Sequence, residues 1–152
     1  MLLPDLPPDL RFQAIRRDDP AGCEFVFQAK KAALGPHIVP KWGWDEAGQR
    51  ELHCERLKMR EYLKILQNEC SVGVIALTQS SGHIELDDFY IMPEHQNQGI
   101  GTRVLRHSIQ TCRGMALRLR YIKWNPVGSL YRRHGFAMIG EMETHWLVER
   151  PA

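Results

Sequence analysis

The stretch His95–Leu105, HQNQGIGTRVL, places two glycines two residues apart, directly before an amphipathic run. A helix N-terminus offers unpaired N–H groups and the positive end of the helix dipole. Because glycine has no Cβ, an anion can approach the backbone closely at Gly99 and Gly101, and the Thr102 hydroxyl can reach one phosphate oxygen. The stretch therefore fits a pyrophosphate cradle. The alternative is a tight turn before an ordinary helix, and Gly-x-Gly alone does not decide between them.

Composition limits the classes of protein that need to be considered. The chain has 152 residues and a formal net charge of +2, which suits one compact domain and indicates neither nucleic acid nor a membrane surface as a partner. No apolar run approaches the ~20 residues needed to span a bilayer. The start of the chain has early acids and prolines, and lacks the pattern of a secretory signal. Four scattered cysteines predict reduced thiols in a cytoplasmic protein without a metal site: Cys23, Cys54, Cys70 and Cys112.

The pattern of apolar residues, turns and caps predicts the order β-α-α-β-β-β-α-β-α-β-β. A flexible leader is expected over residues 1–10, followed by a single domain over 11–150. The expected elements are strands at 10–16, 60–67, 71–78, 83–92 and 115–122, helices at 20–34, 44–58, 99–112 and 126–134, and two closing strands within 136–149 around Gly140. The class is α/β (α+β).

Two other phosphate-binding loops do not match. A Walker loop needs GxxxxGK[ST], which is absent from the chain. A dinucleotide fingerprint needs GxGxxG after an early strand, but Val104 stands where its third glycine would be, and the motif lies two thirds of the way along the chain.

The residues around the two glycines resemble the GNAT superfamily of acetyl-CoA-dependent N-acetyltransferases. Gln96–Gly101 matches the signature Q/R-x-x-G-x-G/A, and Phe89–Glu94 resembles the strand end and Pro-Glu before it. Downstream, Asn125-Pro126 and Leu130–Phe136 (LYRRHGF) resemble the second motif of the family. The stretch from Trp42 to Gln49 looks like a bacterial subgroup of unassigned substrate. The resemblance makes residues 11–150 an acetyltransferase domain.

The resemblance implies a mixed, mostly antiparallel central sheet with helices on both faces. The sheet would splay after the strand at 83–92, and acetyl-CoA would lie in the gap. Backbone groups of this strand would bind the pantetheine, and N–H groups around residues 97–102 would bind the pyrophosphate. Arg103 could reach a phosphate or face solvent. The implied cofactor-binding residues are Tyr90, Ile91, Met92, Gln96, Asn97, Gln98, Gly99, Ile100, Gly101, Thr102 and Asn125.

Alternation along the strand at 83–92 puts His83, Glu85 and Asp87 on one face. Three polar residues would be costly in a dry core, so this face is expected to line a wet cleft. An alkylammonium must lose a proton before it can attack. By resemblance, Glu85 is the first candidate for the general base and Asp87 the second. Alternatively, both bind the cation of the substrate, or water removes the proton; in either case they favour a cationic acceptor.

Tyr131 matches the family tyrosine that lies near the thioester sulfur and protonates the departing thiolate. The alternative role is that of a core aromatic on a short helix. Trp42, Trp44 and Phe27 are candidates for an aromatic wall around the acceptor, although packing of a helix on the sheet explains them equally well.

The expected reaction is direct transfer of the acetyl group to a primary amine of a small molecule or peptide in a ternary complex. The backbone N–H near Ile91 would polarise the thioester carbonyl. The alternatives are a non-catalytic acyl-CoA-binding or sensor domain, and a protein lysine or N-terminal acetyltransferase. A homodimer through the last strands is a further expectation.

Overall fold

Seven strands, four α-helices and one 3-10 turn follow one another in the computed structural model, which describes residues 1–152. The elements are β1 (Leu10–Ala14), α1 (Pro20–Trp42), α2 (Glu46–Met59), β2 (Tyr62–Gln67), β3 (Cys70–Ser80), β4 (His83–Ile91), η1 (Pro93–His95), α3 (Ile100–Thr111), β5 (Ala116–Ile122), α4 (Gly128–Arg133), β6 (Ala137–Glu141) and β7 (His145–Arg150). Apart from η1, this is the predicted order. No helix has the length and apolarity that crossing a membrane requires.

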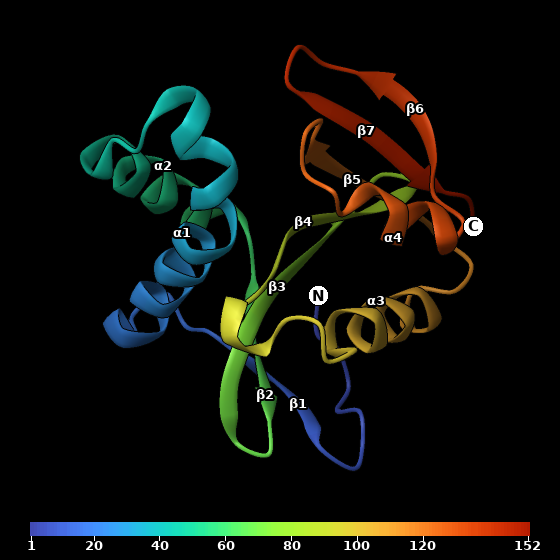
Figure 1. Ribbon diagram of the computed structural model, residues 1–152. Helices are drawn as coiled ribbons and strands as arrows, with labels where there is room; N and C mark the ends of the chain where they lie inside the picture. The colour runs from blue at the N-terminus through green and yellow to red at the C-terminus, as the bar shows by residue number, and fades with distance from the viewer.

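The strands form one sheet in the order β1-β2-β3-β4-β5-β7-β6. Every neighbouring pair is antiparallel except β4 and β5, which run parallel and pair only where His83–Glu85 faces Ala116–Arg118. Beyond Glu85 the two strands separate, so the sheet opens into two halves (Figure 1). The prediction of a mostly antiparallel sheet that splays after the strand at 83–92 is confirmed.

Helices cover both faces of the sheet, as predicted: α1 and α2 lie on one side of β2–β4, and α3 lies on the other (Figure 1). On α3, the buried residues Ile100, Val104 and Leu105 fall on one helical face and join the main core against the sheet. A smaller core under α1 includes Val26 and Val74. The two cores lie on opposite faces of the sheet. Neither of them replaces β5 beyond Glu85, so the edge of β4 there is left without a neighbouring strand.

A β-bulge interrupts β4 at the point where the sheet opens. Ala76 of β3 pairs with Asp88, and its neighbour Leu77 pairs with Leu86, which leaves Asp87 as the extra residue. Leu86 belongs to the main core, whereas Asp88 contacts Arg60 on the α1 side of the sheet. The bulge therefore adds Asp88 to the polar face that alternation predicted for Glu85 and Asp87.

Two predicted boundaries are wrong because tertiary contacts override the local signals. Helix α1 continues through Gly35-Pro36 to Trp42. Its last turns are held by Trp124, whose Nε1 donates to the carbonyl of His37 at 2.8 Å and whose ring lies 5.1 Å from the ring of Trp42. At the other end of the chain, Gly140 lies inside β6 rather than in the turn to β7.

Residues 1–10 are not the loose leader that was predicted. Leu3 is buried in the main core, and so is Leu10 at the start of β1. Arg103 of α3 donates to both carboxylate oxygens of Asp9, at 3.0 and 2.7 Å, and His107 Nε2 lies 2.6 Å from the carbonyl of Pro4. The apolar side chains of this segment join the core, and its polar contacts hold it against α3.

Candidate active site

The turn before α3 presents six consecutive backbone N–H groups, from Asn97 to Thr102, that have no acceptor within the protein. The first hydrogen bond of the helix runs from the N–H of Arg103 to the carbonyl of Gly99. Gly99 has a φ of 81°, which disfavours other residues there. A Cβ on Gly101 would meet only Ile91, at 3.7 Å, so the space beside its backbone is open. We call residues 97–102 the anion turn, because this arrangement suits a phosphate group.

Side chains around the anion turn mostly have structural roles. Gln96 Nε2 donates to the carbonyl of Ile91 at 2.9 Å, which ties the turn to the end of β4. The side chain of Ile100 is buried in the core, and Gln98 Nε2 donates to the carbonyl of Glu94 at 3.4 Å. Arg103 is occupied by Asp9, so the positive character of the turn comes from its backbone.

The open edge of β4 has fewer backbone groups free to bind a ligand than the sequence analysis expected. The N–H of Met92 donates to Val72 of β3, and its carbonyl accepts from His95, so Met92 has no free backbone group for a ligand. Tyr90 pairs in register with Val74 of β3. Strand alternation then turns the N–H of Ile91 toward the side from which β5 has departed. Of the three predicted pantetheine contacts, Ile91 alone presents its N–H there.

Close packing of β3 against β4 depends on Gly73, which lies opposite Ile91. A Cβ at this position would overlap the carbonyl oxygen of Tyr90. Glycine therefore sets the position of the β4 backbone at the open edge.

A cleft of about 1200 Å³ runs from the anion turn, along β4, to the helices α1 and α2. Its floor includes Glu85 and Ile91 of β4, and α4 contributes Tyr131. One cavity thus joins the predicted phosphate, thioester and acid–base positions.

Tyr131 lies in this cleft with 6% of its surface exposed, against the rings of Tyr121 and Phe136. Its hydroxyl makes no hydrogen bond with the protein. Burial, and then Tyr121, raises the pKa of this phenol above its ordinary value, so it stays protonated at neutral pH. Asn125 also lines the cleft, and its Oδ1 accepts from the N–H of Val127 at 3.1 Å in the turn before α4.

Glu85 and Asp87 both line the cleft, but their surroundings differ. Glu85 Oε1 lies 2.8 Å from His83 Nε2, and its second oxygen has no partner. Asp87 accepts from the Thr78 hydroxyl at 2.5 Å and lies 3.6 Å from Arg60 Nε. Burial raises the pKa of Asp87, and Thr78 and Arg60 oppose that effect. Glu85 is therefore the freer of the two carboxylates.

Sequence reasoning missed a buried cluster around Asp88, which is 5% exposed. Its carboxylate accepts from Arg60 Nη1 at 2.8 Å, from the Tyr62 hydroxyl at 2.5 Å and from the Tyr90 hydroxyl at 2.8 Å. The cluster joins the end of α2 to β2 and β4. Two adjacent aspartates in an alternating strand were the available signal for the bulge that creates it.

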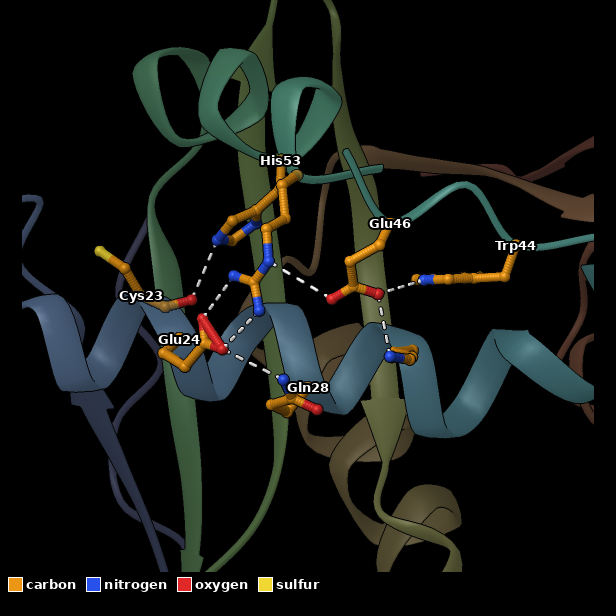
Figure 2. Close-up of polar contacts among 8 residues, drawn as sticks. Cys23, Glu24, Gln28, Trp44, Glu46 and His53 are labelled. Atoms are coloured by element: carbon orange, nitrogen blue, oxygen red, sulfur yellow. Dashed lines mark hydrogen bonds and ion pairs between the residues drawn. The ribbon is translucent and has the colours of Figure 1, made fainter. Parts of the chain in front are cut away.

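The predicted aromatic wall is largely a helix–helix contact. Phe27 is completely buried, packs against Trp44 and His53, and does not line the cleft. Trp44 does not line it either, and its Nε1 donates to Glu46 at 2.7 Å. Figure 2 shows Trp44, Glu46 and His53 in the polar network that holds α2 to α1, with His53 Nε2 2.9 Å from the carbonyl of Cys23. Only Trp42, 53% exposed, lines the cleft.

Comparison with known proteins agrees with this arrangement. The chain matches the sequence model of the Acetyltransferase (GNAT) family over residues 11–136. A comparison with curated proteins finds no match.

Similar solved structures show the same fold. They include the PaiA N-acetyltransferase from Thermoplasma acidophilum in complex with coenzyme A (TM-score 0.74, 17% identity, covering 95% of this chain and 100% of that one). An acetyltransferase from Thermus thermophilus has a TM-score of 0.75 at 14% identity, covering 95% and 98% of the two chains. Arabidopsis thaliana Naa50, in complex with the bisubstrate analogue CoA-Ac-MVNAL, has a TM-score of 0.64 at 13% identity, covering 95% and 100%.

Proposed function

This chain belongs to the GNAT acetyltransferase family, and on that premise we propose that it moves the acetyl group of acetyl-CoA directly to a primary amine of a small molecule or peptide. Acetyl transfer itself follows from the family. The observation that carries the amine acceptor is the single cleft in which an open strand edge, a free carboxylate and an unpaired tyrosine hydroxyl meet.

The residues present fit acetyl-CoA as the donor. The anion turn offers N–H groups without acceptors, and the open space beside Gly101 leaves room for a phosphate. The unpaired edge of β4 can hydrogen-bond an extended pantetheine arm in the manner of an added strand. Two structures of the same fold hold coenzyme A or an analogue built on it, which supports this assignment.

Three groups of the chain then act on the reaction. Glu85, with one oxygen free, accepts the proton of the attacking amine directly or through water, and Asp87 is the alternative base. The N–H of Ile91 donates to the thioester oxygen, where negative charge develops. The Tyr131 hydroxyl protonates the leaving sulfur, because its raised pKa keeps it a donor at neutral pH.

The test is a thiol-release assay with acetyl-CoA against a panel of primary amines, beside calorimetric titration with acetyl-CoA. We expect tight binding of acetyl-CoA and thiol release that depends on the amine. Binding without release in the presence of any amine or peptide would contradict the amine acceptor and would favour a binding domain.

We also propose a homodimer through β6 and β7. β6 is an edge strand of the sheet, and it exposes the apolar side chains of Met138 and Ile139. Sedimentation velocity at micromolar concentration tests this proposal, and a monomer at every concentration would contradict it.

A further inference from the structure

Four basic side chains from four different elements line the end of the cleft away from the anion turn. They are Lys30 of α1, Arg56 of α2, Arg120 of β5 and His145 at the start of β7. We call this part of the cleft the basic end. Elements from both halves of the sheet therefore converge on it, and three of the four side chains, those of Lys30, Arg56 and Arg120, are cations.

These cations have no anionic partner in the protein. Lys30 is 6% exposed, yet it makes no hydrogen bond and no ion pair. Arg56 makes neither through its side chain, and the acceptor near Arg120 is the sulfur of Met142, 4.0 Å from Nη1. No carboxylate contacts the Lys30 ammonium, and low dielectric disfavours its charged form, although the charge of Asp88 partly opposes this.

Most of the acidic side chains that line the same cleft are paired, and the exception is Asp45, which is exposed just before α2. Asp87 and Asp88 share Arg60, and tyrosine and threonine hydroxyls donate to them as well. Glu85 lies against His83. Positive charge therefore remains unpaired in the cleft together with the free oxygen of Glu85, so a cationic acceptor alone does not account for the whole cleft.

The cations are close enough to influence one another. Burial, and then the charge of Arg56, lowers the pKa of Lys30 to about 8. Burial, and then the charges of Arg120 and Arg56, lowers the pKa of His145. The charge of Arg56 thus acts on both Lys30 and His145, and all three side chains line the cleft. The buried amide oxygen of Gln49, also in the cleft, is without a hydrogen-bond partner, so the same cavity has a further unused polar atom.

We infer that the acceptor is a small amine that also carries an anionic group, a carboxylate or a phosphate, and that Lys30 and Arg56 bind this anion with Arg120 beside them. The inference rests on the proposed function and names its substrate class. The amine of such a molecule would face Glu85, and its anion would face the basic end. Ion-paired hydrogen bonds to both groups would orient the molecule for attack.

The experiment measures kcat/KM for matched acceptors at saturating acetyl-CoA. Each α-amino acid is compared with its C-terminal amide, and 2-aminoethyl phosphate is compared with ethanolamine. We expect at least one anionic member to exceed its neutral partner by roughly 10- to 100-fold. The pair that responds distinguishes a carboxylate from a phosphate.

Variants assign the effect to residues. Lys30→Met keeps the unbranched shape and most of the length of the side chain without its charge, and Arg56→Gln removes the second cation. Both should move the ratio between the anionic and neutral acceptors toward one, mainly through a higher KM for the anionic member. Lys58→Met is the matched control, because Lys58 is an exposed cation that lies on α2 near Arg56 and outside the cleft. It should leave the ratio unchanged.

Three results would overturn the inference. Equal kcat/KM within every pair, or a preference for the neutral amines, contradicts anion recognition while amine acetylation stands. A ratio that survives in both Lys30→Met and Arg56→Gln shows that these residues do not bind the anion. If acetyl-CoA binds but no amine is acetylated, the proposed function fails, and the inference fails with it.

Discussion

At one end of the cleft, six consecutive N–H groups of a single turn have no acceptor, whereas at the other end three cations come from three separate elements. The anion turn is a backbone site. It depends on where the chain can bend and on whether a Cβ is present, as at Gly99 and Gly101. The basic end is a side-chain site, and its ligand preference depends on each residue. A mutation can therefore change one end and leave the other intact, because the two ends are built from different parts of the chain.

The largest effect is expected between the two ends, at Tyr131. Tyr131→Phe removes the proton donor for the leaving sulfur and should lower kcat by roughly 100-fold or more. The Kd for acetyl-CoA should change little, because the anion turn makes no use of this hydroxyl. Pre-steady-state thiol release and calorimetry measure the two quantities. A kcat close to that of wild type would show that Tyr131 is a core aromatic.

The next largest effect is expected at Glu85, and it should exceed the effect of the matching substitution at Asp87. Glu85→Gln removes the carboxylate with a free oxygen and is expected to reduce kcat/KM about 100-fold. Asp87→Asn should reduce it less, since Asp87 is held by Thr78 and Arg60. Kinetics of both variants with one amine decide the order. If Asp87→Asn is the more damaging, the base is Asp87.

The basic end should lose its preference for anions at high pH. The pKa of Lys30 is lowered to about 8 by burial and by Arg56, with Asp88 acting in the opposite sense and Arg60 adding to the lowering. Lys30 is charged below this pKa and neutral above it, so its contribution is present at lower pH and lost as pH rises through about 8. Between about pH 7 and about pH 9, the ratio between anionic and neutral acceptors should fall roughly tenfold.

Lys30→Met provides the control for this pH profile. Its ratio should be low and should change less over the same interval, because the titrating group is gone. A wild-type profile that parallels the variant would assign the pH dependence to the acceptor itself.

The smallest effect is expected where a cation lies near the anion turn but is occupied. Arg103→Gln and Asp9→Asn should each change the Kd for acetyl-CoA by less than about threefold, because Arg103 is bound to Asp9. Each should lower the free energy of unfolding only slightly, because the ion pair is screened by solvent, and urea unfolding measures this. A large loss of acetyl-CoA affinity in Arg103→Gln would mean that a side chain, and not only the backbone, binds the phosphates.

The contrast between the anion turn, a local backbone site, and the basic end, a site of side chains from distant elements, also explains what could be predicted from sequence. The strand at 83–92, the turn at 97–102 and the helix after it were predicted because alternation, glycines and an amphipathic run are local signals. Tyr131 and Asn125 were predicted from a compact motif, and both line the cleft.

The features that were not predicted from sequence depend on contacts between residues that are far apart in the chain. The bulge that turns Asp88 toward Arg60 requires the register with β3, and the burial of Leu3 requires the packed core. Lys30 and Arg56 are ordinary helical cations in the sequence. Only the assembled fold brings them into the cleft and leaves them without partners, so no local pattern could single them out.

The central claim is that the backbone of the anion turn holds acetyl-CoA for transfer, and calorimetric titration with acetyl-CoA tests it most directly. Wild type should bind tightly, and Gly99→Val/Gly101→Val should lose binding, since Val disfavours the φ of Gly99 and fills the space beside Gly101. Gln98→Ala, which alters only a side chain of the same turn, should bind within about threefold of wild type. Equal affinity for wild type and the double glycine variant, or no binding by wild type, would contradict the claim.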